Sequence, residues 1–184
     1  MIRVLFFSII FLCISTHHGA RATNLSSQIG SVEFPTSGSG ETQQHFIKGV
    51  AALHSFWYPE ALQAFKSSTK ADPNFAMGYW GQAMAHNAPL WARQDTKAAK
   101  AALSKISNMS ELTQRERNYI QAVQLLYGDG EKSTRDKAYS NAMKKIYTNY
   151  PKDLEAACFY SLSLLGVARN TEKKMKLNVD SGAI

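Results

Sequence analysis

Cysteine is nearly absent from this sequence, which holds only Cys13 and Cys158 in 184 residues. Cys13 lies in an N-terminal apolar run that we expect to be removed, so the mature chain would keep one thiol and could form no internal disulfide. Because Cys158 falls in an apolar helical stretch, we expect its thiol to be buried; an intermolecular disulfide or a reactive thiol is the alternative. Stability is therefore expected to come from packed helices and not from cross-links.

Motifs for catalysis or metal binding are also missing: the chain has no Cys-x-x-Cys, His-Glu-x-x-His or Gly-x-Ser-x-Gly. Gly128–Ser133 resembles a phosphate loop only superficially, because it lacks the adjacent Gly-Lys pair and follows a helical stretch. His45 and His54 are nine residues apart, which places them on opposite faces of one helix, and His86 lies on another. We predict no catalytic residues, no metal site and no cofactor.

Blocks of basic residues are absent, although the chain is mildly basic with 21 Lys and Arg against 14 Asp and Glu, a formal charge of +7. Removal of the N-terminal apolar segment, with Arg3 and Arg21, would lower the formal charge to +5. No Lys or Arg cluster with interleaved aromatics appears, so no nucleic-acid partner is expected. The hydrophobic fraction of 45% is enough for one domain with a real core.

The N-terminus has the features of a secretory signal peptide. Arg3 gives a positive start, Val4–Ile14 is almost entirely apolar, and Ala20-Arg21-Ala22 is a small-x-small cleavage site. The run is too short to cross a bilayer core of ~30 Å, so we expect cleavage of residues 1–22, no membrane span afterwards, and a secreted or periplasmic protein; an uncleaved anchor is the alternative. Residues 23–42, rich in Ser, Gly and Thr, are predicted to be a flexible lead-in.

Helical periodicity begins after this lead-in. Apolar residues recur at spacings of four, three and four, on one face of a helix: Phe46, Val50, Leu53 and Trp57. Pro59 suits the first turn of a second helix. Asp72 precedes Pro73 and is pushed out of the helical region, so the second helix is expected to end there. A third helix is predicted from Phe75.

Five residues in this stretch have a recognisable spacing: Gly49, Tyr58, Ala61, Phe65 and Pro73. The pattern resembles the tetratricopeptide repeat, a helix–turn–helix unit of about 34 residues. The resemblance implies that Gly49 and Ala61 are small where two antiparallel helices touch, that Phe65 fills the gap between repeats, and that Pro73 closes the unit. Pro151 would close a later unit in the same way. An ordinary helical hairpin is the alternative interpretation.

The predicted fold is therefore all-α: antiparallel helix-pair repeats forming a tetratricopeptide-like solenoid over residues 43–168, with about three units, the last incomplete. Ala88–Trp91 interrupts the second unit, and Thr113 and Glu116 predict a capping box at a later helix. The helix expected at Asp153–Val167 has no evident partner, because residues 169–184 form a polar tail. The apolar face of this helix would then be uncovered. This indicates either that the chain self-associates through its C-terminal helix or that it is a shortened piece of a longer array.

The resemblance also implies a function. The first helix of each pair lines a concave groove in tetratricopeptide proteins, so the candidate partner-binding residues are Val50, His54, Trp80, Met84 and Asn87. We expect a non-enzymatic scaffold that binds a protein or peptide in this groove. In the alternative, Trp80 and Met84 pack between repeats. A helical enzyme or ligand-binding module with an inter-helix site, or a fragment of a larger repeat protein, are the other hypotheses. Several aromatic residues also gather near helix ends and turns: Trp57, Tyr58, Tyr79, Trp80 and Trp91.

Overall fold

A computed structural model describes residues 30–168, 181, 182 and 184 of the chain. The signal peptide predicted at residues 1–22 lies outside the described residues, and so do residues 23–29 of the predicted lead-in. Most of the predicted polar tail, residues 169–180 and 183, also lies outside them.

Within the described residues the fold is all-α, as predicted, with one very short hairpin between two of the helices. In chain order the elements are α1 (Gly40–His54), α2 (Tyr58–Ala71), α3 (Ala76–Ala85), β1 (Asn87–Ala88), the 3-10 turn η2 (Pro89–Trp91), β2 (Arg93–Gln94), α4 (Thr96–Leu103), α5 (Gln114–Leu126), α6 (Lys132–Asn149) and α7 (Leu154–Ala168). The hairpin occupies the place where the sequence indicated an interruption of the second unit. None of the described helices is long and apolar enough to cross a membrane.

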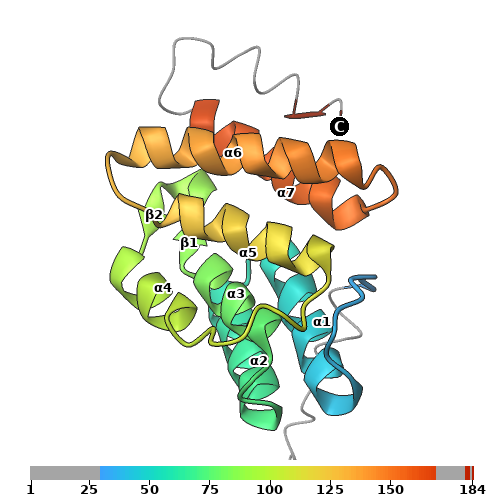
Figure 1. Cartoon of the computed structure of the whole chain (residues 1–184). Coiled ribbons are helices and arrows are strands. Elements are labelled where there is room, and N and C mark those ends of the chain that lie inside the picture. Colours follow the sequence, from blue (N-terminus) through green and yellow to red (C-terminus); the bar gives the residue numbers. More distant parts are fainter. Residues whose placement is uncertain (1–29, 169–180, 183) are drawn as a thin grey trace, which may run out of the picture.

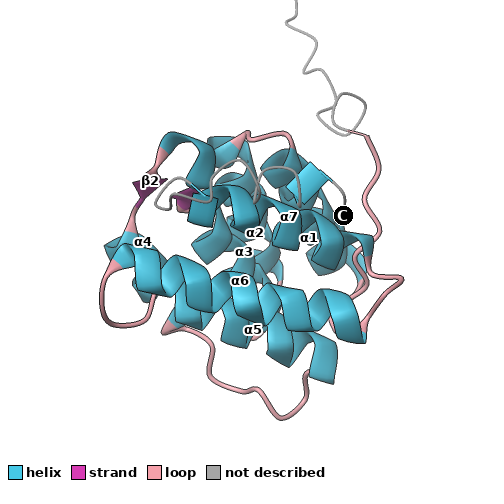
Figure 2. Ribbon diagram, turned by 90° about the horizontal axis from the view of Figure 1, so that it is seen from above, coloured by secondary structure: helices cyan, strands magenta, loops and turns pink. Residues whose placement is uncertain are grey.

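Helices that follow one another in the chain pack side by side: α1 with α2, α2 with α3, α3 with α4, α5 with α6, and α6 with α7. Helix α3 lies at the centre, since it also contacts α1 and α5. In Figure 1, α5, α6 and α7 run across the upper half of the molecule, above α1, α2, α3 and α4. The view from above in Figure 2 places α4 at the margin, next to β2. Strand β2 is therefore at the edge of the molecule, whereas β1 is buried and η2 contacts α7.

Helices begin and end at the proline and capping residues from which their boundaries were predicted. Pro59 occupies the first turn of α2, and α2 ends at Ala71 because Asp72, before Pro73, adopts an extended conformation. The capping box predicted for α5 is confirmed. The Thr113 hydroxyl accepts a hydrogen bond from the Glu116 N–H at 3.2 Å, and the Glu116 carboxylate accepts one from the Thr113 N–H at 2.9 Å.

The core beneath α1, α2 and α3 is built around Phe65, whose side chain is fully buried. Its ring lies against Gly49 of α1 and Gly81 of α3, and a Cβ atom at either glycine would overlap the ring. Gly49, expected to be small where two helices touch, lies where α1 packs against α2, and the Phe65 side chain occupies the space beside it. The Phe65 side chain thus lies between α1 and α3.

The N-terminal segment 34–39 is part of the packed fold and not a linker that leads into it. Phe34 is 1% exposed, and its ring lies 5.3 Å from that of Phe46 and 5.0 Å from that of Tyr119, centroid to centroid. The Arg115 guanidinium stacks over the outer side of Phe34 at 4.2 Å and donates to the Pro35 carbonyl at 3.1 Å. A Ser- and Gly-rich composition concealed this single anchoring aromatic, and α1 itself begins at Gly40, inside the predicted lead-in.

Candidate functional site

The five residues predicted to line a concave groove are not on one surface. Val50 and Trp80 are 0% and 1% exposed and lie in the core, so neither can contact a partner in this structure. Met84 and Asn87 line a small enclosed cavity between helices. His54 is partly exposed at the end of α1, where its ring lies against Phe159 at 4.9 Å and pairs with the Glu155 carboxylate. The periodicity of these helices does not distinguish the groove face from the core face, because α3 is buried along its whole length.

The most exposed aromatic side chains of the described region gather elsewhere, between the start of α2 and the hairpin. Trp91 is 52% exposed and Phe56 is 39% exposed. The Trp91 ring meets Phe56 edge-on at 5.7 Å and Tyr58 edge-on at 6.1 Å. Phe56 and Tyr58 line an open depression of about 810 Å³, together with His86, Arg93 and neighbouring hairpin residues. Trp91 does not line this depression but packs on both rings beside it. We call the depression, with the Trp91 ring at its side, the aromatic cleft.

Two residues of the aromatic cleft have a strained backbone. Phe56 has φ 59° and Ala92 has φ 51°, and they are the only non-glycine residues with positive φ in the described part of the chain. Phe56 follows the end of α1 at a position where glycine is usual, and its N–H donates to the Leu53 carbonyl at 3.0 Å. Such conformations cost about 1–3 kcal/mol each and cluster at functional sites. The Phe56 side chain that follows this turn is exposed and lines the cleft.

The charges around the cleft are unequal. Asp95 is committed to capping α4, because its carboxylate accepts from the Ala98 N–H at 3.0 Å. Arg93 is exposed and forms no ion pair with any described residue. Burial, aided by the positive charge of Lys66, holds the pKa of His86 below its ordinary value in spite of the nearby Asp95 carboxylate. At neutral pH the cleft therefore presents an unpaired guanidinium beside aromatic rings and a neutral imidazole.

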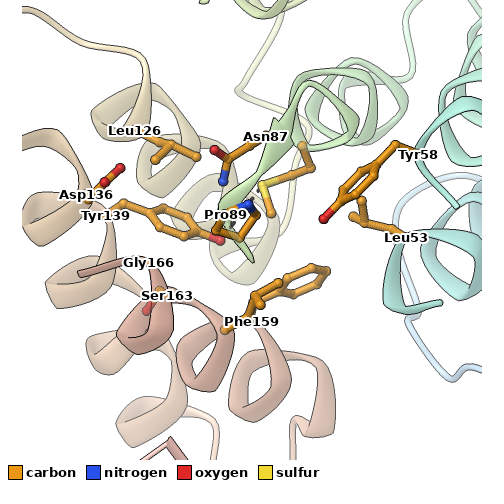
Figure 3. A pocket seen from close by; sticks show the side chains of 12 residues that line it. Leu53, Tyr58, Asn87, Pro89, Leu126, Asp136, Tyr139, Phe159, Ser163 and Gly166 are labelled. Atoms are coloured by element: carbon orange, nitrogen blue, oxygen red, sulfur yellow. Dashed lines mark hydrogen bonds between the residues drawn. The ribbon is translucent and has the colours of Figure 1, made fainter. Parts of the chain in front are cut away.

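Tyr58 forms the wall between the cleft and the enclosed cavity, which has a volume of about 30 Å³. Figure 3 shows the Tyr58 hydroxyl directed into this cavity, with Asp136 and Tyr139 on the opposite side. The hydroxyl is the one buried side-chain polar atom of the described region without a hydrogen-bond partner. Burial raises the pKa of Tyr58, and the nearby Arg93 charge opposes that effect. The space suffices for one or two water molecules.

No protein-family model, curated protein or solved structure matches this chain. Its function is therefore inferred from the residues and geometry of its own surface.

A second exposed surface lies on α7, where Leu154 is 76% exposed. The structure corrects the expectation of a buried thiol: Cys158 is exposed on the same helix, because it lies on the side of α7 that borders an open groove. Ser181 lies against this helix, where its hydroxyl donates to the Ser161 carbonyl at 2.8 Å, and Ile184 reaches the groove beside Leu154. The end of the described chain thus covers part of the face on which self-association was predicted.

The described residues contain no cluster of three His, Cys, Asp or Glu side chains able to hold a metal ion.

The sequence pattern indicated that Trp57, Tyr58 and Trp91 lie near helix ends but did not join them into one site. It gave no prediction for Phe56 or Arg93. The signal for Phe56 was the aromatic run that replaces a glycine at the end of the first helix. Pairing across the hairpin, which brings Arg93 beside Ala88, had no signal in the sequence.

Proposed function

We propose that this protein is a non-enzymatic binding protein that takes a protein or peptide partner at the aromatic cleft. The observation that carries the proposal is the mutual packing of Phe56, Tyr58 and Trp91 at the surface, where two of the three rings remain substantially exposed. Exposed aromatic clusters with an adjacent arginine are typical of the side chains that dominate binding energy at interfaces. The strained backbone at Phe56 and Ala92 supports the same interpretation.

The tetratricopeptide resemblance supports a scaffold role. We infer that α1 and α2, α3 and α4, and α5 and α6 form successive helix-pair units of a short solenoid, with α7 beginning an incomplete one. In this arrangement the partner surface differs from the concave groove of the family, because the hairpin that interrupts the second unit supplies Trp91 and Arg93. The apolar run at Val4–Ile14 and the site at Ala20-Arg21-Ala22 support export, to a secreted or periplasmic location.

Selection from a random peptide library tests this function. The chain from Thr23 is used as the target, and the affinity of each enriched peptide is then measured for the wild-type chain and for the Trp91→Ala variant. Trp91→Ala is a suitable reference because the side chain is half exposed and contributes to no buried core. We expect enrichment of peptides that bind the wild-type chain and lose at least about tenfold in affinity on the variant. Peptides that bind both proteins equally, or no enrichment at all, would contradict a binding role for the cleft.

A ligand-binding module with an inter-helix site is a second candidate, favoured by the Tyr58 hydroxyl directed into the enclosed cavity. The cavity of about 30 Å³ is far smaller than the 300–1,000 Å³ usual for small-molecule sites. Tyr58→Phe distinguishes the two candidates. If the hydroxyl only lacks a partner, the variant is unchanged or more stable to urea by up to about 1 kcal/mol. A loss of stability would show that the hydroxyl binds something within the cavity.

A further inference from the structure

We propose that the aromatic cleft recognises an extended proline-rich peptide that carries acidic residues, with proline rings packed on the aromatic side chains and a carboxylate on Arg93. This inference rests on the proposed binding function and specifies the chemistry of the partner. It follows from three properties of the cleft: its unpaired charge, the mutual orientation of its rings and the short strands beside it.

The first property is the charge. Arg93 stands at the rim of the cleft without an ion pair among the described residues, and it acts electrostatically on the Tyr58 hydroxyl that forms the cleft wall. Lys66 is also exposed and acts on His86 from the neighbouring helix. Asp95, the acidic residue lining the cleft, already receives the Ala98 N–H at the start of α4. The local balance favours an anionic group on the partner, and a guanidinium can bind a carboxylate through two parallel hydrogen bonds.

The second property is the orientation of the rings. Trp91 is inclined at 71° to Phe56 and at 90° to Tyr58, so the three ring planes face in different directions and do not form one continuous flat surface. A flat ligand such as a nucleobase needs a parallel ring face on which to stack. A proline ring is puckered and presents C–H groups in several directions, so it can contact two perpendicular aromatic faces at once. Aromatic-lined grooves recognise polyproline II segments in this way.

The third property concerns the peptide backbone. Each strand of the hairpin is two residues long, and β1 and β2 already pair with each other. The hairpin is closed further by the Asp95 N–H, which donates to the His86 carbonyl at 2.9 Å. So short an edge cannot align an added β-strand. A polyproline II segment makes no internal hydrogen bonds and keeps its backbone solvated, so it needs no such edge and loses little conformational entropy on binding.

Fluorescence anisotropy with labelled synthetic peptides tests the proposal. The mature chain from Thr23 is titrated into a peptide of repeated Pro-Pro-Glu, and into matched peptides of repeated Pro-Pro-Lys and Gly-Ser-Glu. We expect measurable binding of the Pro-Pro-Glu peptide and at least about tenfold weaker binding of the other two. Arg93→Glu should weaken Pro-Pro-Glu by at least about tenfold and strengthen Pro-Pro-Lys. The control Lys137→Glu reverses an exposed charge on α6, outside the cleft, and should leave the affinities unchanged within about twofold.

The outcomes separate this inference from the function on which it rests. Equal binding of Pro-Pro-Glu and Pro-Pro-Lys, or equal effects of Arg93→Glu and Lys137→Glu, would overturn the role of Arg93. Equal binding of the Gly-Ser-Glu peptide would overturn the preference for proline. If none of the three peptides binds while library peptides still depend on Trp91, the cleft is a binding site for a different chemistry. If no peptide of either kind depends on Trp91, the proposed function fails as well.

Discussion

The backbone N–H of Ser37 donates to the Glu116 carboxylate at 2.7 Å, across 79 residues of sequence. The Ser37 hydroxyl donates to the same oxygen at 2.8 Å, while the other oxygen closes the capping box with Thr113. One carboxylate therefore starts helix α5 and also holds the N-terminal segment against it. The interaction joins two parts of the chain that the sequence pattern treats as separate: a polar lead-in and the third helix pair.

Glu116→Gln should lower stability most at neutral pH. Burial alone would raise the pKa of Glu116, but the hydrogen bonds from Ser37 and Thr113 outweigh it and hold this pKa below its ordinary value of 4.5. A depressed pKa in the folded state means that the stabilisation is fully present above about pH 4.5 and is lost as pH falls through the folded-state value. We expect Glu116→Gln to cost about 1.5–3 kcal/mol at pH 7 and progressively less in acid.

Urea unfolding of both chains as a function of pH measures this difference. Glu111→Gln serves as the control, because Glu111 is exposed just before the same helix. The control should change the free energy of unfolding by no more than about 0.5 kcal/mol. A cost for Glu116→Gln that stays constant from pH 7 down to strongly acidic pH would show that the negative charge contributes nothing.

Phe34→Ala should destabilise the protein as strongly as a core substitution in a helix. The ring is 1% exposed, and it contacts Phe46, Trp80 and Tyr119. Removing it leaves a cavity at this junction, with an expected cost of about 3–5 kcal/mol in urea unfolding. Glu33→Ala, at the exposed preceding position, should be nearly neutral. A cost below about 1 kcal/mol for Phe34→Ala would show that segment 34–39 is a lead-in that does not contribute to the packed core.

Phe65 and Gly81 should be strongly coupled. A Cβ at position 81 would overlap the Phe65 ring, so Gly81→Ala alone is expected to cost about 1–3 kcal/mol through overpacking. Phe65→Ala alone should cost roughly 3–5 kcal/mol. In the double variant the new methyl group enters the space left by the ring. The double variant should therefore lose less stability than the sum of the losses of the two single variants. Strict additivity in a double-mutant cycle would mean that the two residues do not meet.

The parts of the fold that were predictable are those governed by local patterns. Helix periodicity identifies Phe46 and Phe65 as core residues, and Pro73 marks the end of a helix. The capping box of Thr113 and Glu116 lies within a single helical turn. Phe34 was missed because nothing in a Ser- and Gly-rich segment indicates which distant aromatics its ring will join. Such contacts depend on packing between elements, which no local window contains.

Cys158 should react with thiol reagents in the native state, but slowly. The residue is exposed on α7, while partial burial, with the Glu155 and Asp153 carboxylates, raises the pKa of its thiol. A raised pKa lowers the thiolate fraction at pH 7, and the thiolate is the reactive form. We expect the chain from Thr23, in which Cys158 is the one cysteine, to react fully with Ellman's reagent, at a rate below that of the same chain in urea. No reaction before unfolding would indicate a buried thiol, and a faster native rate would indicate an activated one.

The candidate site was harder to predict than the fold. Val50 and Trp80 lie on apolar helix faces, and periodicity identifies such faces without saying whether they meet a partner or the protein's own core. Phe56 and Trp91 are brought together by a left-handed turn after α1 and by a hairpin of two-residue strands. Backbone conformations of this kind, in residues other than glycine, have no reliable sequence signature.

The central claim is that the aromatic surface available to a partner is at Trp91 and not at Trp80. The free energy of unfolding of Trp80→Ala and Trp91→Ala, measured side by side in urea, tests it most directly. Trp80 is 1% exposed and Trp91 is 52% exposed, so we predict a loss of about 3–5 kcal/mol for Trp80→Ala and at most about 1.5 kcal/mol for Trp91→Ala. Equal losses, or a larger loss for Trp91→Ala, would contradict the account by making Trp91 part of the structural core.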